Sequence, residues 1–114
     1  MIHKNLSAII PQLTSHNVGL KRVLVCNDET ESDITQIAVT TLRAGEETDR
    51  HKHESMEEYF LFVKGKATLT VEDKELNCAK GDFVAVRRGE AHQLKAIDDT
   101  ELITIGCATE NGKE

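Results

Sequence analysis

The amino-acid sequence predicts an all-β fold, and three observations lead to this class. Short segments rich in β-branched or aromatic residues recur along the 114 residues of the chain. Turn signals that contain Gly, Asn or Asp separate these segments about every ten residues. No segment keeps an apolar helical period beyond about two turns, and Pro11 interrupts the best candidate, which starts at Ser7. Strands of this length and spacing are typical of a β-sandwich or a β-barrel.

The expected strands differ in their patterns. The first ends at an Asn-Asp turn signal, and the second mixes Ile, Val and Thr, which fit a pleated surface. The third is a continuous apolar run, which indicates a strand covered on both faces. The fourth alternates apolar and polar residues, as a half-buried strand does, and a turn is expected after it over residues 72–75. In chain order, we expect strands over residues 21–26, 34–42, 59–63, 67–71, 83–86 and 102–105.

Length and composition bound the architecture. A chain of 114 residues has the size of one domain, so we expect a single domain over residues 1–114. Its core is expected within residues 18–107, and residues 108–114 are expected to form a polar, mobile tail. The three cysteines are far apart and form no Cys-x-x-Cys pair, which argues against a disulfide framework. Because the N-terminus also lacks the apolar segment of a signal peptide, we expect a cytoplasmic protein.

The charge of the chain narrows its partners. Acidic residues outnumber basic residues by 20 to 14, which gives a net charge of -6. An acidic chain is poorly suited to bind nucleic acid or an anionic membrane surface. No run of about 18 apolar residues is present, so no transmembrane helix is expected. We therefore expect a small-molecule ligand, and neither nucleic acid nor a membrane as a partner.

Histidine is the unusual component of the sequence, with five residues in a small chain. On an extended strand, His51 and His53 project to the same side, because side chains alternate. With a carboxylate five residues further on, they make three of the ligands that a divalent metal needs. A His-x-His pair alone is more often a solvated surface feature, and by spacing alone His92 adds only modest support. His3 and His16 are isolated, and we expect both to be exposed.

The segment around these histidines resembles the first motif of the cupin superfamily. That motif is Gly, five residues, His-x-His, three or four residues, Glu, six residues, Gly. Here Gly45, His51, His53, Glu58 and Gly65 fill every position, with four residues between His53 and Glu58.

A second segment resembles the second cupin motif, which is Gly, five residues, Pro-x-Gly, two residues, His, three residues, Asn. Gly81, Gly89 and His92 fill three of its five positions. The sequence departs from the motif at two places, where Arg87 replaces Pro and Ala96 replaces Asn. Together the two motifs cover residues 45–96, about half of the chain.

The resemblance implies a double-stranded β-helix, the jelly-roll barrel of cupins, with one divalent transition metal ion inside it. His51, His53, Glu58 and His92 would be its ligands. Imidazole and carboxylate ligands suit Fe, Mn, Ni, Co, Cu or Zn. The carboxylate leaves one positive charge on the site, which favours an anionic substrate. Four protein ligands also leave two positions of an octahedral ion open.

Two adjacent carboxylates, Glu57 and Glu58, compete for the fourth ligand position. The motif requires six residues before its final glycine, and this spacing selects Glu58. Strand alternation then places Phe60 and Phe62 on the same side as Glu58. We expect a partly aromatic substrate pocket there, with Arg87 near its mouth to attract a carboxylate. Plain core packing of the phenylalanines and a solvated Arg87 are the simpler interpretations.

The other side of the same strand carries Tyr59, Leu61 and Val63 and is also apolar. Such a face needs a cover, which an N-terminal strand or a second subunit would provide. Since cupins often dimerise in that way, the resemblance implies a homodimer.

Three functions are compatible with these motifs. The leading hypothesis is a metal-dependent oxygenase, decarboxylase or isomerase of a small organic molecule, in which Glu58 is a candidate catalytic base. The alternative is a non-catalytic cupin that binds or senses a small molecule, with a structural or adventitious metal. A metal-free sugar-modifying enzyme is the third, and the intact set of four ligands argues against it.

Overall fold

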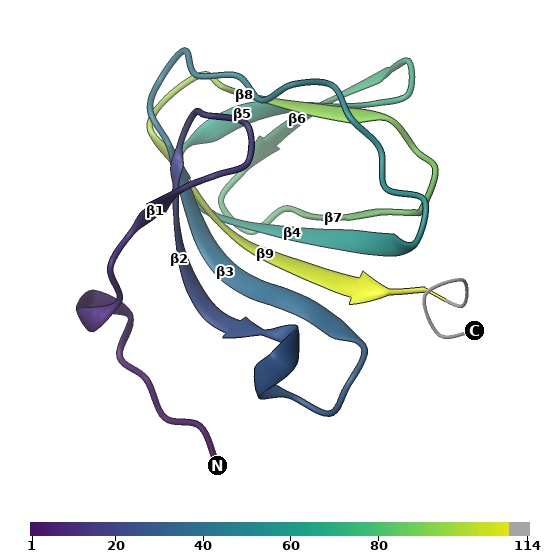
Figure 1. Cartoon of the computed structure of the whole chain (residues 1–114). Helices are drawn as coiled ribbons and strands as arrows, with labels where there is room; N and C mark the ends of the chain where they lie inside the picture. Colours follow the sequence, from purple (N-terminus) through teal and green to yellow (C-terminus); the bar gives the residue numbers. More distant parts are fainter. Residues whose placement is uncertain (110–114) are drawn as a thin grey trace.

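The computed structural model describes residues 1–109 and contains two antiparallel sheets that face each other (Figure 1). Within these residues there is no α-helix, and only two 3-10 turns, η1 (Leu6–Ala8) and η2 (Asn27–Glu29), are helical. No helix of residues 1–109 is long and apolar enough to span a membrane. The strands are β1 (Gln12–Leu13), β2 (Leu20–Cys26), β3 (Ile34–Leu42), β4 (Met56–Lys64), β5 (Lys66–Val71), β6 (Lys74–Ala79), β7 (Phe83–Val86), β8 (His92–Ala96) and β9 (Thr100–Ala108).

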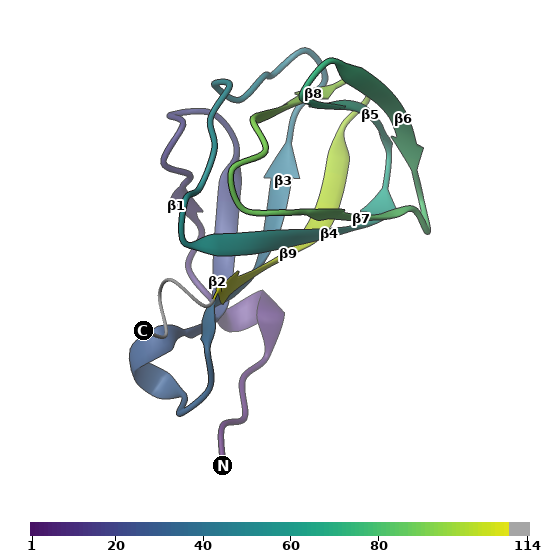
Figure 2. The same cartoon turned by 90° about the vertical axis from the view of Figure 1, so that its right-hand side faces the viewer.

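The strand order confirms the jelly-roll barrel. The larger sheet has the order β1-β2-β3-β9-β4-β7, and the smaller sheet has the order β6-β5-β8. The last strand, β9, lies between β3 and β4, so pairs distant in sequence close the larger sheet. The two views show the smaller sheet lying across the curved larger one (Figure 2). This arrangement encloses the space in which the predicted ligands meet.

The core fills the space between the two sheets. Strand β4 shows the alternation that the sequence predicts: Phe62 is 1% exposed, whereas its neighbour Leu61 is 38% exposed. Phe62 packs in one cluster with buried residues of the opposite sheet, among them Leu69 and Leu94. Apolar side chains of both inner faces therefore hold the sheets together, as in other β-sandwiches.

Three strands were not among those expected, the two-residue β1 and the longer β6 and β8. Strand β6 is the polar edge of the smaller sheet, and its first residues were assigned to a turn that is in fact only Glu72–Asp73. Strand β8 begins at His92 and carries Lys and Gln, so its apolar pattern is weak. Both strands form because β5 pairs with them on either side. Pairing with a neighbour, rather than local propensity, decides such strands.

The expected tail does not begin at residue 108. Ala108 is the last residue of β9, and the Thr109 N–H donates to the Ser55 carbonyl at 2.9 Å. These backbone bonds hold residues 108 and 109 against the barrel. The remaining part of the predicted tail, residues 110–114, lies outside the described residues.

Candidate metal centre

The histidines of the first motif lie on an extended segment between β3 and β4, not on the strand expected from their alternation. Only isolated bridges form there, Glu47 with Lys95 and His51 with His92. His51 and His92 each donate the backbone N–H to the carbonyl of the other, at 3.0 and 2.8 Å. The Gly89 N–H donates to the His53 carbonyl at 2.7 Å. The second motif thus holds the first in place, and His51 and His53 still face the same cavity.

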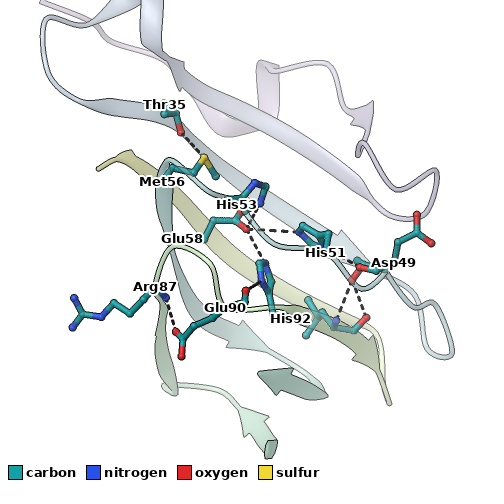
Figure 3. Close-up of polar contacts among 11 residues, drawn as sticks. Thr35, Asp49, His51, His53, Met56, Glu58, Arg87, Glu90 and His92 are labelled. Carbon is teal, nitrogen blue, oxygen red and sulfur yellow. Dashed lines mark hydrogen bonds and ion pairs between the residues drawn. The ribbon is translucent and has the colours of Figure 1, made fainter. Parts of the chain in front are cut away.

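The four predicted ligands come together in the structure (Figure 3). The Glu58 Oε1 atom lies 3.0 Å from the Nε2 atoms of His53 and His92 and 3.9 Å from that of His51. One candidate ligand atom from each residue lies within 4.8 Å of all the others. Atoms that bind one ion at ~2.1 Å lie about 3 Å apart when adjacent and about 4 Å apart when opposite. The cluster therefore suits a metal ion.

Backbone carbonyls orient two of the imidazoles. The Nδ1 atom of His51 lies 2.8 Å from the Asp49 carbonyl, and that of His92 lies 3.0 Å from the Glu90 carbonyl. A carbonyl only accepts, so Nδ1 carries the proton in both rings. This leaves Nε2 of each ring directed at Glu58 (Figure 3). Such an outer hydrogen bond fixes the tautomer and the ring orientation of a metal ligand.

The charges of the cluster stabilise one another. Burial disfavours the carboxylate form of Glu58, but the hydrogen bond from His92 and the nearby imidazoles outweigh burial and lower the pKa of this carboxyl. Burial also disfavours the charged form of His92, yet Glu58 and the Glu90 carbonyl raise the pKa of this imidazole. For His51, burial prevails and lowers the pKa. A bound cation would thus replace a proton on His92 beside an ionised Glu58.

The adjacent carboxylate, Glu57, points the other way. It accepts a hydrogen bond from the Tyr59 hydroxyl at 2.6 Å and one from Arg87 Nη1 at 3.1 Å. Glu57 is therefore not part of the ligand cluster, as its position in the motif predicts. The Arg87 side chain is 70% exposed and is not among the residues that line the cavity. The structure thus places Arg87 on the outside of the barrel, because its partner Glu57 is there.

A cavity of about 310 Å³ opens beside the ligand cluster. Of the two phenylalanines expected at a pocket, Phe60 lines it, whereas Phe62 is buried in the core between the sheets. Leu42, Leu94 and Leu102 add apolar lining. The described residues that line it also include four side chains of β2, β3 and β9, namely Lys21, Gln36, Thr40 and Thr104.

A family model for the cupin domain matches residues 38–106. The chain belongs to the cupin family. An uncharacterized protein from Methanocaldococcus jannaschii is 24% identical over 72 residues, which cover 63% of this cupin and only 58% of that relative's length.

Solved structures with the same architecture span several named proteins. A predicted oxalate decarboxylase from Thermotoga maritima has a TM-score of 0.85 and 20% identity over 92% of this cupin and 97% of that chain. Ectoine synthase from P. lautus has a TM-score of 0.83 and 20% identity, over 100% of this cupin and 83% of that chain. KdgF from Halomonas sp. has a TM-score of 0.80 and 14% identity over 100% of both chains. At these identities the similarity establishes the fold.

The two departures from the second cupin motif have structural substitutes. The Arg87 N–H donates to Glu90 Oε1 at 2.8 Å, and the Glu90 N–H donates to the Arg87 carbonyl at 3.2 Å. Proline has no N–H, so the first of these bonds requires another residue at this position. Ala96 is fully buried, and its carbonyl accepts the Gly45 N–H at 2.8 Å. Hydrogen bonds and packing therefore hold both sites without the motif residues.

One further histidine belongs to this cupin's site. His16 was expected to be isolated and exposed, but it lines the cavity and its ring centroid lies 4.3 Å from that of His51. The turn Thr14–Gly19 presents it, with the Thr14 N–H bonded to the Gly19 carbonyl at 3.3 Å and positive φ at Asn17 and Gly19. The Asn and Gly signal a turn in the sequence. They do not indicate that the turn lies against residues 35 positions away. His3 is exposed, as expected.

Proposed function

We propose that this cupin is a metal-dependent enzyme that acts on a small organic anion. The observation that carries the proposal is the continuity of the ligand cluster with a cavity of about 310 Å³. A structural metal site is closed by its ligands, whereas a catalytic site keeps positions open to substrate. Here the three histidines and Glu58 all line the cavity.

The residues present fit a divalent transition metal, since three imidazoles and one carboxylate are the donors that such ions prefer. When bound, the metal would supply Lewis acidity to a substrate carbonyl or carboxylate, and redox chemistry if it is iron, manganese or copper. Decarboxylation, isomerisation and oxygenation are thus the reaction classes that we propose. The similarity to a predicted oxalate decarboxylase and to ectoine synthase supports an enzyme with this fold.

Residues of the chain prepare the site in two ways. Glu58 is held ionised by the imidazoles around it, so it can bind the metal or accept a proton from substrate. Phe60, Leu94 and Leu102 line the adjacent cavity and limit the water beside the reacting atoms. The catalytic role therefore falls to Glu58, with His51, His53 and His92 as the remaining ligands.

The test begins with the metal. The purified chain should hold close to one ion, by elemental analysis, and His53→Ala should lose it while His3→Ala should not. Protein that is fully folded and equally stable without metal, or equal metal in both variants, would contradict the site.

Turnover is then measured on protein reloaded separately with Fe, Mn, Ni, Co, Cu or Zn. Small carboxylic acids are assayed for carbon dioxide release, oxygen consumption and isomer formation by NMR. We expect turnover with at least one metal, and its loss in His53→Ala. Metal-dependent binding of acids without any turnover would instead support the alternative function, a small-molecule-binding cupin.

A further inference from the structure

The larger sheet adds polar side chains to the cavity lining, beside apolar ones such as Leu42 and Leu102. Four of these polar residues, Lys21 on β2, Gln36 and Thr40 on β3, and Thr104 on β9, form the group that we call the polar wall. Lys21 and Thr40 are register partners on neighbouring strands. The Lys21 ammonium donates to Gln36 Oε1 at 3.2 Å, and the hydroxyls of Thr40 and Thr104 lie 3.2 Å apart. None of these residues belongs to either cupin motif.

Lys21 is a cation without a carboxylate partner. Its Nζ makes no ion pair within the described chain, residues 1–109, and its hydrogen-bond acceptor there is the amide of Gln36. Lys4 and Lys52, in contrast, each form an ion pair with a glutamate. An ammonium group has three N–H donors, so two remain after the bond to Gln36. A half-buried lysine with two free N–H donors and no carboxylate partner can bind an anionic group of a ligand.

The charges around the cavity favour the same kind of ligand. Glu58 is the one carboxylate among the described lining residues. A divalent ion at the ligand cluster would leave one positive charge after Glu58 is counted, and Lys21 adds a second. The cavity would thus hold two positive charges without a negative partner, one at the metal and one at Lys21 in the polar wall.

We propose that Lys21, held by Gln36, binds a carboxylate of the substrate, so that the substrate is an organic acid with a metal-binding group and a separate carboxylate. This assignment rests on the proposed function and specifies its substrate class. The cavity volume of about 310 Å³ is roughly ten times the ~30 Å³ that one water molecule occupies in the liquid. It therefore has room for a short carbon chain that carries a metal-binding group and a separate carboxylate. Leu42, Phe60 and Leu102 line the cavity and would contact that chain.

Calorimetric titration of the zinc-loaded full chain tests the assignment without any turnover. The probes are the monohydroxamates of malonic, succinic and glutaric acid, whose hydroxamate group binds zinc. Each acid is compared with its neutral terminal amide. We expect at least one acid to bind about tenfold more tightly than its amide, as a charged hydrogen bond provides. Lys21→Met should abolish this preference and leave the affinity of the amides unchanged.

Three variants make the result specific. Lys74→Met removes an exposed lysine of the smaller sheet and should keep the preference for the acid. Lys21→Gln should lose the preference, and Lys21→Arg should retain it; zinc content of one per chain in each variant verifies the fold. If the preference for the acid survives in Lys21→Met, or if the native chain binds acids and amides equally well, the assignment of Lys21 is overturned. The proposed function is not affected by either result. Failure of every hydroxamate to bind zinc-loaded protein contradicts the proposed function and, with it, the assignment.

Discussion

The two faces of strand β4 carry similar residues in opposite environments. On the inner face, Glu58 lies among three imidazoles at the candidate metal centre, and Phe62 is buried in the core. On the outer face, Glu57 is paired with Arg87, and Leu61 is partly exposed. Adjacent glutamates therefore have different roles because the side chains of a strand alternate.

The two glutamates share their ionisation state but differ in their surroundings. The pKa of both carboxyls is lowered, for Glu57 by the Tyr59 hydroxyl and then Arg87, and for Glu58 by His92 and its neighbours against the effect of burial. An ionised carboxylate is thus common to both faces. What differs is that only the inner carboxylate lies beside the imidazoles and the cavity. Substitutions in matched pairs on the two faces test this difference.

The largest effect is expected on stability, from the apolar residues of β4. Phe62→Ala should lower the free energy of unfolding by about 3–5 kcal/mol, because it leaves a cavity between the sheets. Leu61→Ala should lower it by less than about 1 kcal/mol, since that side chain is partly exposed. Urea denaturation followed by circular dichroism measures both values. Equal losses would show that the two faces are packed alike.

The next effect concerns metal affinity. Glu58→Gln should weaken binding by about 100-fold or more, because the ligand loses its charge and a donor atom. Glu57→Gln should leave affinity within about twofold of the native chain, since Glu57 contacts Tyr59 and Arg87 instead. Competition with a chromophoric chelator gives both constants. A comparable loss of metal affinity in Glu57→Gln would show that Glu57, on the outer face, is the fourth ligand and would contradict the assignment of Glu58.

A smaller effect is expected from pH. The pKa of His92 is raised above its ordinary value of 6.5, so the metal must displace a proton from this imidazole over a range above pH 6.5. Affinity should rise about tenfold per pH unit there and level off once His92 is neutral. Titration in two buffers of different ionisation enthalpy counts the released proton. The Glu57→Gln variant should show the same profile, and a flat profile in the native chain would contradict the interpretation.

The smallest effect concerns the outer face as an interface. Tyr59 stacks on Phe83, which is 60% exposed, and Leu61 lies on the same strand. We expect a homodimer that uses this face, and Phe83→Lys should weaken it about tenfold. Sedimentation velocity over a range of concentrations measures the change, with Ile97→Lys as the control for an exposed apolar residue elsewhere. If the native chain stays monomeric at all concentrations, the prediction that this face forms a homodimer interface is wrong.

Much of the site could be predicted because it depends on local spacing. The first motif places His51, His53 and Glu58 at fixed intervals, and alternation then assigns Glu58 and Phe60 to the inner face. Both assignments hold in the structure, even though the histidines lie on an extended segment with isolated bridges instead of a strand. The glycine that ends the motif shows a similar local cause. Gly65 has a φ of 89°, and a Cβ there would collide with the backbone of Asp99.

The residues that escaped prediction are those whose role depends on a distant neighbour. His16 and Lys21 belong to no motif, and they reach the site only because the turn after β1 and strand β2 lie against the barrel opening. Strand β8 was missed for the same reason, since its pairing with β5 determines it.

Local patterns in the sequence thus predicted the all-β class, because periods are properties of neighbouring residues. The resemblance to the cupin motifs supplied the four candidate ligands and the choice of Glu58 over Glu57. Tertiary structure decided which side chains join those ligands in one cavity. It placed Arg87 outside and Phe62 in the core, and it brought His16 and Lys21 to the site. Contacts between segments far apart in the chain follow from how the sheets pair and close, and no local pattern records them.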